Sequence, residues 1–194
     1  MRFIKILVTV LLVFAVVAPA TAGDSSAPGS GKSPFPAFGA GPVEVRLYSD
    51  YFCPPCQQVE PFLDPILKDL LLKNVIRLVL VDFPMHNETP LYARYFLYAL
   101  KSRSDVDHAL HVRGTLFRAA AGKEYLTAPK VEGLLKANRI PYAAFEPKPV
   151  FDRYNALMQE DKVRGTPTIV IVRGGGKETF VGGADIIKAL KGLK

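Results

Sequence analysis

Apolar and polar residues recur along the chain in two different periods, and the changes of period predict the order of its elements. Residues 43–49 (VEVRLYS) alternate with period two, and residues 75–83 (VIRLVLVDF) are mostly apolar, so both are predicted strands. Apolar positions in residues 53–73 recur instead at helical spacing. After the second strand, the same reasoning predicts helices over 89–102, 105–121, 128–138 and 150–162, strands over 166–172 and 178–181, and a last helix over 185–193.

This order predicts an α/β protein with a mixed β-sheet and an inserted helical segment. A strand, a helix and a strand in succession predict a parallel pair joined by a right-handed crossover. Two closing strands separated by a Gly-Gly-Gly turn predict an antiparallel hairpin on the same sheet. The helical insertion covers residues about 87–162 between the two halves of the sheet.

The beginning of the chain has the three parts of a secretory signal peptide. Arg2 and Lys5 supply positive charge, residues 6–18 are a 13-residue apolar run broken only by a threonine, and residues 20–22 are small. This pattern predicts a signal peptide over residues 1–22, cleaved after its last alanine. Thirteen residues of helix rise about 20 Å, less than the roughly 30 Å of a hydrocarbon core, which favours a cleaved signal over an anchor.

The segment after the signal is rich in Gly, Ser, Ala and Pro. Residues 23–41 therefore predict a flexible leader that buries little surface, with the folded domain at 42–194. No dimerisation segment is evident before the domain, so a monomer is expected.

The charge distribution excludes nucleic acid as an expected partner. The net charge is +7, of which Arg2 and Lys5 contribute two, leaving 7 − 2 = +5 for the rest. Lys and Arg are scattered, whereas a nucleic-acid binder gathers them on one element. An apolar content of 49% and a charged content of 22% are typical of a globular domain.

Two cysteines carry the candidate chemistry. Cys53 and Cys56 are the only cysteines of the chain; they enclose Pro54 and Pro55, follow a predicted strand and open a predicted helix. Unpaired N–H groups and the dipole at a helix start favour a thiolate, so Cys53 is the expected nucleophile and Cys56 the resolving thiol. The two prolines suit the first helical positions but remove N–H donors, so we expect only a moderately lowered pKa for Cys53.

Two other interpretations of the pair are less favoured. A structural disulfide closing four residues stabilises by only about 2 kcal/mol in the loop-entropy model. A metal site usually takes four ligands, and besides the two cysteines the chain has three histidines, His86, His108 and His111. Copper is the ion we would expect if the thiols bound one. No metal and no dissociable cofactor is predicted.

The residues around the pair resemble a known family. Residues 49–56 (SDYFCPPC) resemble the active-site start of DsbA-like proteins in the thioredoxin superfamily. Pro61 falls where that superfamily kinks its active-site helix, and residues 82–86 (DFPMH) resemble the end of the next strand. Residues 163–168 (VRGTPT) are similar to the cis-proline loop. The resemblance covers roughly residues 42–194.

The resemblance implies a thioredoxin fold with an inserted helical subdomain and a redox-active Cys53–Cys56 disulfide. It also implies that the Thr166–Pro167 bond is cis, that its loop lies against the disulfide, and that the Thr166 backbone pairs with an extended substrate segment. Arg164 is then an active-site neighbour, as are the two intervening prolines.

One departure concerns the proton acceptor. Many members of the superfamily hold a buried acid six positions before the first cysteine, where this chain has Leu47. Asp50, three positions before Cys53, also occurs in DsbA-like sequences.

The resemblance implies a protein thiol–disulfide oxidoreductase that acts on exported proteins, in the periplasm or another extracytoplasmic space. It also implies a membrane partner that recycles the cysteine pair. A dedicated thiol reductant or an isomerase is the alternative within redox chemistry, and a copper-handling thiol protein is the alternative of a different class. The residues are compatible with electron flow in either direction.

Overall fold

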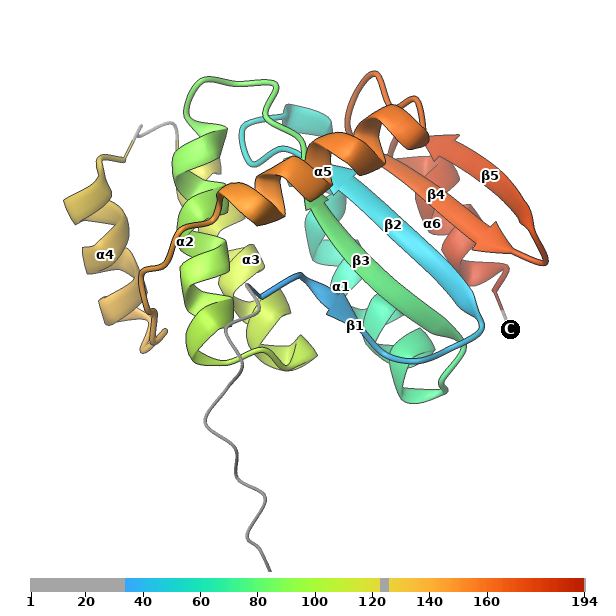
Figure 1. The fold of residues 1–194 in the computed structure, drawn as a ribbon, viewed down its shortest axis with the longest axis horizontal. Coiled ribbons are helices and arrows are strands. Elements are labelled where there is room, and N and C mark those ends of the chain that lie inside the picture. The colour runs from blue at the N-terminus through green and yellow to red at the C-terminus, as the bar shows by residue number, and fades with distance from the viewer. Residues whose placement is uncertain (1–33, 123–125, 194) are drawn as a thin grey trace, which may run out of the picture. The chain divides into compact units, whose positions relative to one another are not determined.

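The computed structural model describes residues 34–122 and 126–193 (Figure 1). The predicted signal peptide lies outside the described residues. The described chain forms a mixed sheet and helices in this order: β1 (Ala37–Phe38), β2 (Val43–Ser49), α1 (Pro54–Leu72), β3 (Ile76–Asp82), α2 (Thr89–Ser102), α3 (Val106–Ala121), α4 (Ala128–Ala137), α5 (Lys148–Glu160), β4 (Thr168–Arg173), β5 (Gly176–Val181) and α6 (Gly183–Lys191).

The sheet has the strand order β1-β3-β2-β4-β5. β2 and β3 are parallel, as the predicted β-α-β unit requires, and β4 and β5 form the predicted antiparallel hairpin beside β2. The parallel register aligns Ser49 with Asp82, so the carboxyl ends of β2 and β3 lie side by side. Residues that follow these two strands therefore meet at one edge of the sheet.

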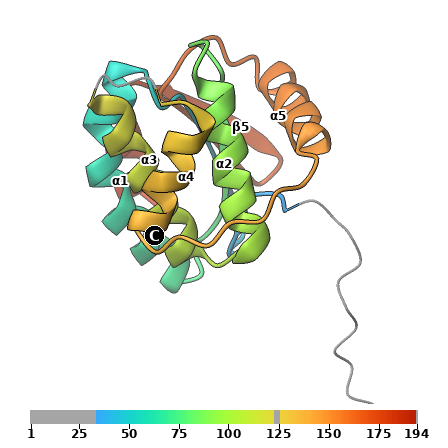
Figure 2. The ribbon, with the colours of Figure 1, turned by 90° about the vertical axis from the view of Figure 1, so that its left-hand side faces the viewer.

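Helices cover both faces of the sheet. α1 and α6 lie behind it in the view of Figure 1, while α5 crosses in front, near the carboxyl ends of β2 and β3. α2, α3 and α4 pack beside one another at the edge nearest α1 and β3 (Figure 2). All the helices of the insertion fall between residues 89 and 160, within the predicted segment.

The folded part begins earlier than the sequence predicts. β1 lies inside the predicted leader and pairs antiparallel with β3, and Phe38 is buried. The Phe35 ring packs under the Arg153 guanidinium of α5, 3.7 Å from its carbon, and Leu80 N donates to Pro36 O at 2.9 Å. The leader prediction is therefore wrong for the last residues before Pro42, because two phenylalanines in a Gly- and Pro-rich stretch bury enough surface to dock it.

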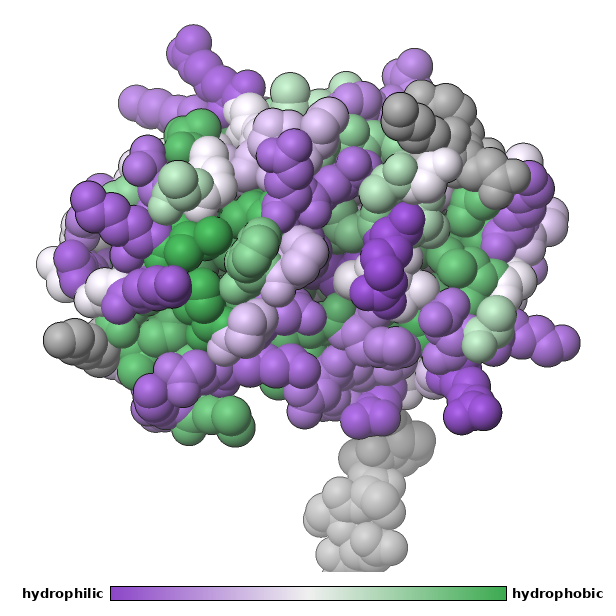
Figure 3. Space-filling model, turned by 180° about the vertical axis from the view of Figure 1, so that it is seen from behind, coloured by the Kyte–Doolittle hydropathy of each residue, from purple (hydrophilic) through white to green (hydrophobic). Residues whose placement is uncertain are grey.

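α1 is one continuous helix although Pro61 and Pro65 lie inside it. Its sheet-facing side is buried, while Phe62 and Leu72 on its other side are exposed. Figure 3 views the molecule from behind, where α1 and α6 lie, and shows hydrophobic surface between hydrophilic side chains. Among the described residues, no helix has both the length and the apolar character needed to cross a membrane.

Candidate active site

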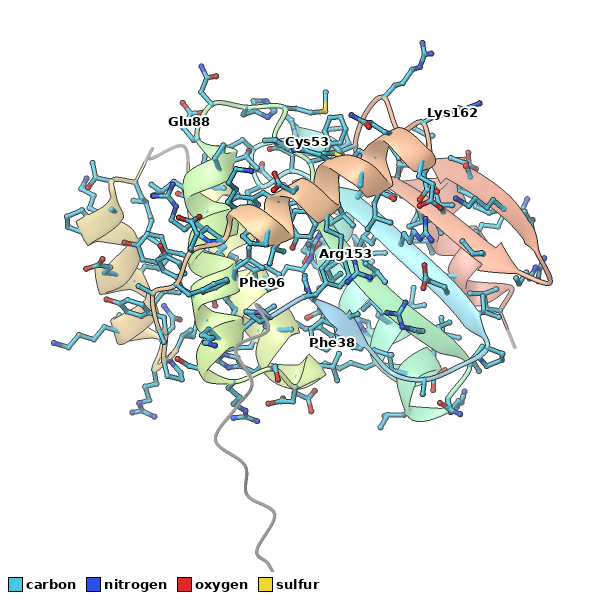
Figure 4. All side chains as sticks on the ribbon, in the orientation of Figure 1. Phe38, Cys53, Glu88, Phe96, Arg153 and Lys162 are labelled. Carbon is cyan, nitrogen blue, oxygen red and sulfur yellow. The ribbon has the colours of Figure 1, made fainter. Side chains whose placement is uncertain are left out.

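The two cysteines lie at the edge of the sheet where β2 ends. Cys53 is the N-cap of α1, with extended backbone angles, and Gln57 N donates to Cys53 O at 3.0 Å to begin the helix. Pro54 and Pro55 occupy the first helical positions, where no intrahelical N–H bond is lost, and both are exposed. Figure 4 shows Cys53 at this edge, between Glu88 before α2 and Lys162 after α5.

The two thiols have different environments, and both are free in the structure. A hydrogen bond from the Cys56 thiol, with smaller effects from Thr166 and the Cys56 N–H, lowers the pKa of Cys53 to about 6 despite its burial. The bond to Cys53 and burial raise the pKa of Cys56 far above its usual range. Cys53 therefore carries the thiolate at neutral pH, and Cys56, 1% exposed, holds its proton.

The loop before β4 lies against Cys53. The Thr166–Pro167 peptide bond is cis, as the resemblance implies, and Thr166 O lies 3.4 Å from Cys53 Sγ. Thr166 Oγ1 lies 3.5 Å from the sulfur of Met85, whose side chain is half-exposed. Arg164 is exposed and lines an open depression beside this loop.

Asp50 anchors the loop that faces the cysteines. It is fully buried, and its carboxylate accepts from the backbone N–H groups of Phe52 at 2.7 Å, Met85 at 2.8 Å and His86 at 3.1 Å. It also accepts from Thr89 Oγ1 at 2.7 Å and lies 3.0 Å from His86 Nδ1. Its oxygens are thus occupied by the loop between β3 and α2, which makes Asp50 a structural anchor of the site.

A buried charged cluster lies below the cysteines. Arg113 of α3 is 1% exposed; its Nε lies 2.6 Å from Glu60 Oε1, and its Nη2 donates to Ser49 Oγ at 2.7 Å. Burial raises the pKa of Glu60 although Arg113 opposes this effect. Burial likewise raises the pKa of Asp82 to about 7, against the lowering effects of Arg113 and of the Tyr51 hydroxyl, which is 3.4 Å away. The cluster thus contains a carboxyl group that titrates near neutral pH.

Aromatic contacts join the active-site loop to the helical insertion. The Tyr51 ring lies 4.9 Å from the Phe117 ring of α3 and 5.7 Å from the Tyr92 ring of α2. The Phe52 ring meets Tyr92 edge-on at 4.9 Å. The two residues before Cys53 are therefore held by helices far along the chain, and the insertion forms the inner wall of the site.

The described residues contain no group of three or more His, Cys, Asp and Glu side chains placed to hold a metal ion. His86 contacts Asp50, His108 is buried and His111 is exposed.

Sequence reasoning found the residues that contact sulfur but missed those beneath them. Leu47 is buried where many relatives hold an acid, and two acids from other positions, Glu60 and Asp82, lie in the cluster instead. Glu60 stands on the apolar face of α1, one residue after Val59, and Arg113 stands on the apolar face of α3. A charged residue on the apolar face of a predicted helix is the signal that could have identified this ion pair.

Comparison with known proteins agrees with this geometry. A family model described as thioredoxin matches residues 39–177, more than half of the chain. No curated protein shows detectable sequence similarity to the chain.

Several solved structures share the fold. A periplasmic thioredoxin-like protein from Salmonella enterica serovar Typhimurium has a TM-score of 0.60 at 20% identity, over 82% of this chain and 89% of that one. A putative protein-disulfide isomerase from Pseudomonas syringae has a TM-score of 0.65 at 15% identity, over 82% and 97%. The α-DsbA1 protein of Wolbachia pipientis (T172V variant) has a TM-score of 0.63 at 10% identity, over 82% and 90%. The predicted thioredoxin fold with a helical insertion is confirmed.

Proposed function

This chain belongs to the thioredoxin family, and we propose that it is an extracytoplasmic oxidoreductase that exchanges disulfides with exported proteins through Cys53 and Cys56. The observation that carries the proposal is the difference in pKa and in burial between the two thiols. Cys53 has a pKa of about 6 and lies at the helix start, whereas Cys56 is buried with a raised pKa. A thiolate is the species that attacks disulfides, and a protonated neighbour is the group that resolves the product.

In the reducing direction, the Cys53 thiolate attacks one sulfur of a client disulfide, and the client's other sulfur leaves as a thiolate. Cys56 then loses its proton and attacks Cys53 Sγ, which releases the first client sulfur. The client gains two electrons, together with one proton from Cys56 and one from solvent, and the pair becomes the Cys53–Cys56 disulfide. In the oxidising direction a client thiolate attacks Cys53 Sγ, Cys56 leaves as the thiolate, and a second client thiolate displaces Cys53.

The loop before β4 supports a role in client binding. Thr166 O lies 3.4 Å from Cys53 Sγ, so a client segment extended along Thr166 and Pro167 has its sulfur beside the nucleophile. Pro54 and Pro55, which follow Cys53 in the chain, are exposed. We assign substrate positioning to this loop.

The cellular setting is part of the same proposal. The signal-like residues 1–22 and the periplasmic location stated for the Salmonella relative support export, and an oxidising compartment suits the chemistry. A membrane redox partner returns the cysteine pair to the redox state in which it reacts with clients. The chain acts as a monomer.

Equilibration of the protein with glutathione buffers tests the proposal. We expect the Cys53–Cys56 pair to reach a defined reduction potential. A value near −120 mV indicates an oxidant of the DsbA type, and a value near −270 mV indicates a reductant of the thioredoxin type. A pair that never exchanges with glutathione would contradict the proposal. Stoichiometric copper binding by such an inert dithiol would favour the metal-handling alternative.

A trapping experiment identifies the attacking sulfur. In the Cys56→Ser variant the mixed disulfide on Cys53 lacks its resolving thiol, so client adducts should accumulate. The Cys53→Ser variant is the matched control, and it should form few adducts because the remaining thiol is buried and protonated. Equal adduct formation by the two variants would overturn the assigned roles.

A further inference from the structure

A cavity separate from the cysteines lies between α2, α5 and the end of β3. Its volume is about 190 Å³. Its walls are mostly apolar and include Pro90 and Ala93 of α2, and Phe151 and Met158 of α5. Asp82 and Tyr154 also line it, and both are buried.

These two residues carry polar atoms without partners. Among the described residues, Asp82 Oδ1 and the Tyr154 hydroxyl have no hydrogen-bond partner, although each is shielded from solvent. An unsatisfied buried polar atom costs about 1–3 kcal/mol, so most folded proteins avoid leaving one. Asp82 and Tyr154 line the same cavity, and the Asp82 charge helps to raise the pKa of Tyr154.

The charges near the cavity indicate which polar group a bound ligand would carry. Arg113 acts electrostatically on both Asp82 and Tyr154, and its positive charge disfavours a second cation beside them. A neutral hydroxyl is compatible with both states of Asp82, because it donates to the carboxylate and accepts from the carboxylic acid. The apolar walls favour a ring or short hydrocarbon as the body of the guest.

We propose that this cavity binds a phenol-like group, an aromatic ring whose hydroxyl pairs with Asp82 Oδ1 and the Tyr154 hydroxyl. The cavity volume suits one ring. The ring lies among Ala93, Phe151 and Met158, and its hydroxyl points to the two unpartnered atoms.

The cavity adjoins a depression that extends toward the loop before β4. This open depression shares Pro84, Asn155 and Met158 with the cavity and extends to Val163 and Arg164, close before Thr166. A tyrosine of a client held at Thr166 is therefore one source of the phenol, and this source rests on the proposed function. A free small phenol is the other source, and its binding is independent of disulfide exchange.

The methionine methyl groups provide a direct readout. The chain has three methionines: Met158 lines the cavity, Met85 lies beside Thr166, and Met1 is at the terminus. With 13C-methyl methionine, titration of p-cresol into the protein should shift the Met158 signal saturably and leave the Met85 signal in place. Toluene, which lacks the hydroxyl, should bind at least fivefold more weakly.

Two variants distinguish ligand binding in the cavity from general effects of a substitution on the fold. Ala93→Met fills the cavity and should weaken p-cresol binding at least tenfold. Tyr154→Phe keeps the ring and removes one partner of the hydroxyl, and it should reduce the preference for p-cresol over toluene. Both should equilibrate with glutathione as the parent does, because neither residue contacts a cysteine. A loss of exchange shows failure of the redox site, whereas a Met158 signal unmoved by p-cresol, or a shift at Met85 alone, overturns the cavity proposal.

Peptides distinguish the two sources. Oxidised peptides carrying a tyrosine at positions one to four from the cysteine are compared with their phenylalanine counterparts for mixed-disulfide formation with Cys56→Ser. A tyrosine preference that Ala93→Met abolishes identifies a client side chain as the guest. Saturable p-cresol binding without that preference identifies a free phenol, and the absence of both contradicts the proposal.

Discussion

The Cys53 sulfur lies between groups that act on its charge in opposite directions. The Cys56 thiol and the Thr166 loop stabilise the thiolate, while burial and the nearby Asp50 carboxylate oppose it. The net result is a pKa of about 6. This agrees with the expectation that the pKa of Cys53 is lowered only moderately, because the two prolines remove N–H donors from the helix start.

The pH dependence of alkylation measures the pKa of Cys53 directly. The rate of reaction of the reduced protein with iodoacetamide should rise with pH around a midpoint of about 6, because only the thiolate reacts. In Cys53→Ser the remaining thiol should react more slowly than Cys53 does in the parent, because Cys56 stays buried and burial alone still raises its pKa after the bond to Cys53 is removed. A midpoint near 8.5, the ordinary cysteine value, would show that the two thiols do not interact as described.

Sequence reasoning at the scale of single residues succeeded where a motif fixes the position. The cis Thr166–Pro167 bond is of this kind, whereas the roles of Cys53 and Cys56 are part of the proposed function. It failed for Arg113 and Asp82, because their roles depend on which helix faces which strand across 31 to 64 residues of chain.

At the scale of elements, a buried ion pair between Glu60 and Arg113 joins α1 to α3. Glu60 and Arg113 are 5% and 1% exposed, so removal of either one leaves the charge of the other without solvation by water. The same two helices are also joined at the surface by Lys68 and Asp107, 3.1 Å apart. The interface between α1 and α3 therefore contains one buried and one exposed ion pair, whose contributions to stability can be compared.

Replacing Arg113 with Met should lower the free energy of unfolding by about 3–5 kcal/mol, because it leaves Glu60 buried and unpaired. The double variant with Glu60→Gln should recover part of the loss. Lys68→Ala is the control and should cost less than about 1 kcal/mol. Urea unfolding measures all three, and equal losses for Arg113→Met and Lys68→Ala would show that burial does not govern the pair.

Gly41 marks a close approach between the segment after β1 and the start of β3. A Cβ at this position would lie 2.3 Å from Ile76 N and from the Val75 carbonyl carbon. Gly133 in α4 has open space around it. Packing thus requires a glycine at position 41 but not at position 133.

Substitution by alanine should therefore have opposite signs at the two glycines. Gly41→Ala should destabilise the protein by about 1–3 kcal/mol, because the backbone of the β1 segment must move away from β3. Gly133→Ala should stabilise by about 0.5–1 kcal/mol through helix propensity. Thermal unfolding of both variants is the measurement, and a neutral Gly41→Ala would show that the β1 segment is loosely attached.

The sequence predicted most elements because their periods are long enough to read. The helix over 89–102 has the predicted bounds, and the strands after it are displaced by only two residues at their starts. β1 was missed because two residues carry no period, and its pairing with β3 becomes visible only in the folded chain.

At the scale of the whole molecule, the charge on Cys53 links the redox state to stability. The pKa of Cys53 is depressed in the folded protein, from about 9 to about 6. Its contribution to stability is therefore complete above the unfolded value and is lost as the pH falls through about 6. Only the reduced protein has this thiolate.

The stability of the reduced protein relative to the oxidised one should therefore increase by about 2 kcal/mol between pH 5 and pH 7.5. Cys56 contributes nothing in this window because its pKa is raised, and Asp82 titrates in both redox forms. Urea unfolding of the two forms at each pH provides the four values. A difference independent of pH would contradict the lowered pKa of Cys53.

The recessed position of Cys53 also determines when a client can react. The side chain is only 6% exposed, and Thr166 O lies 3.4 Å from its sulfur. A compact protein surface does not reach a sulfur in such a position, but a single extended strand does. Under the proposed function, this position favours clients that are still unfolded or have opened locally, so the depth of one thiol would restrict exchange to chains that have not finished folding.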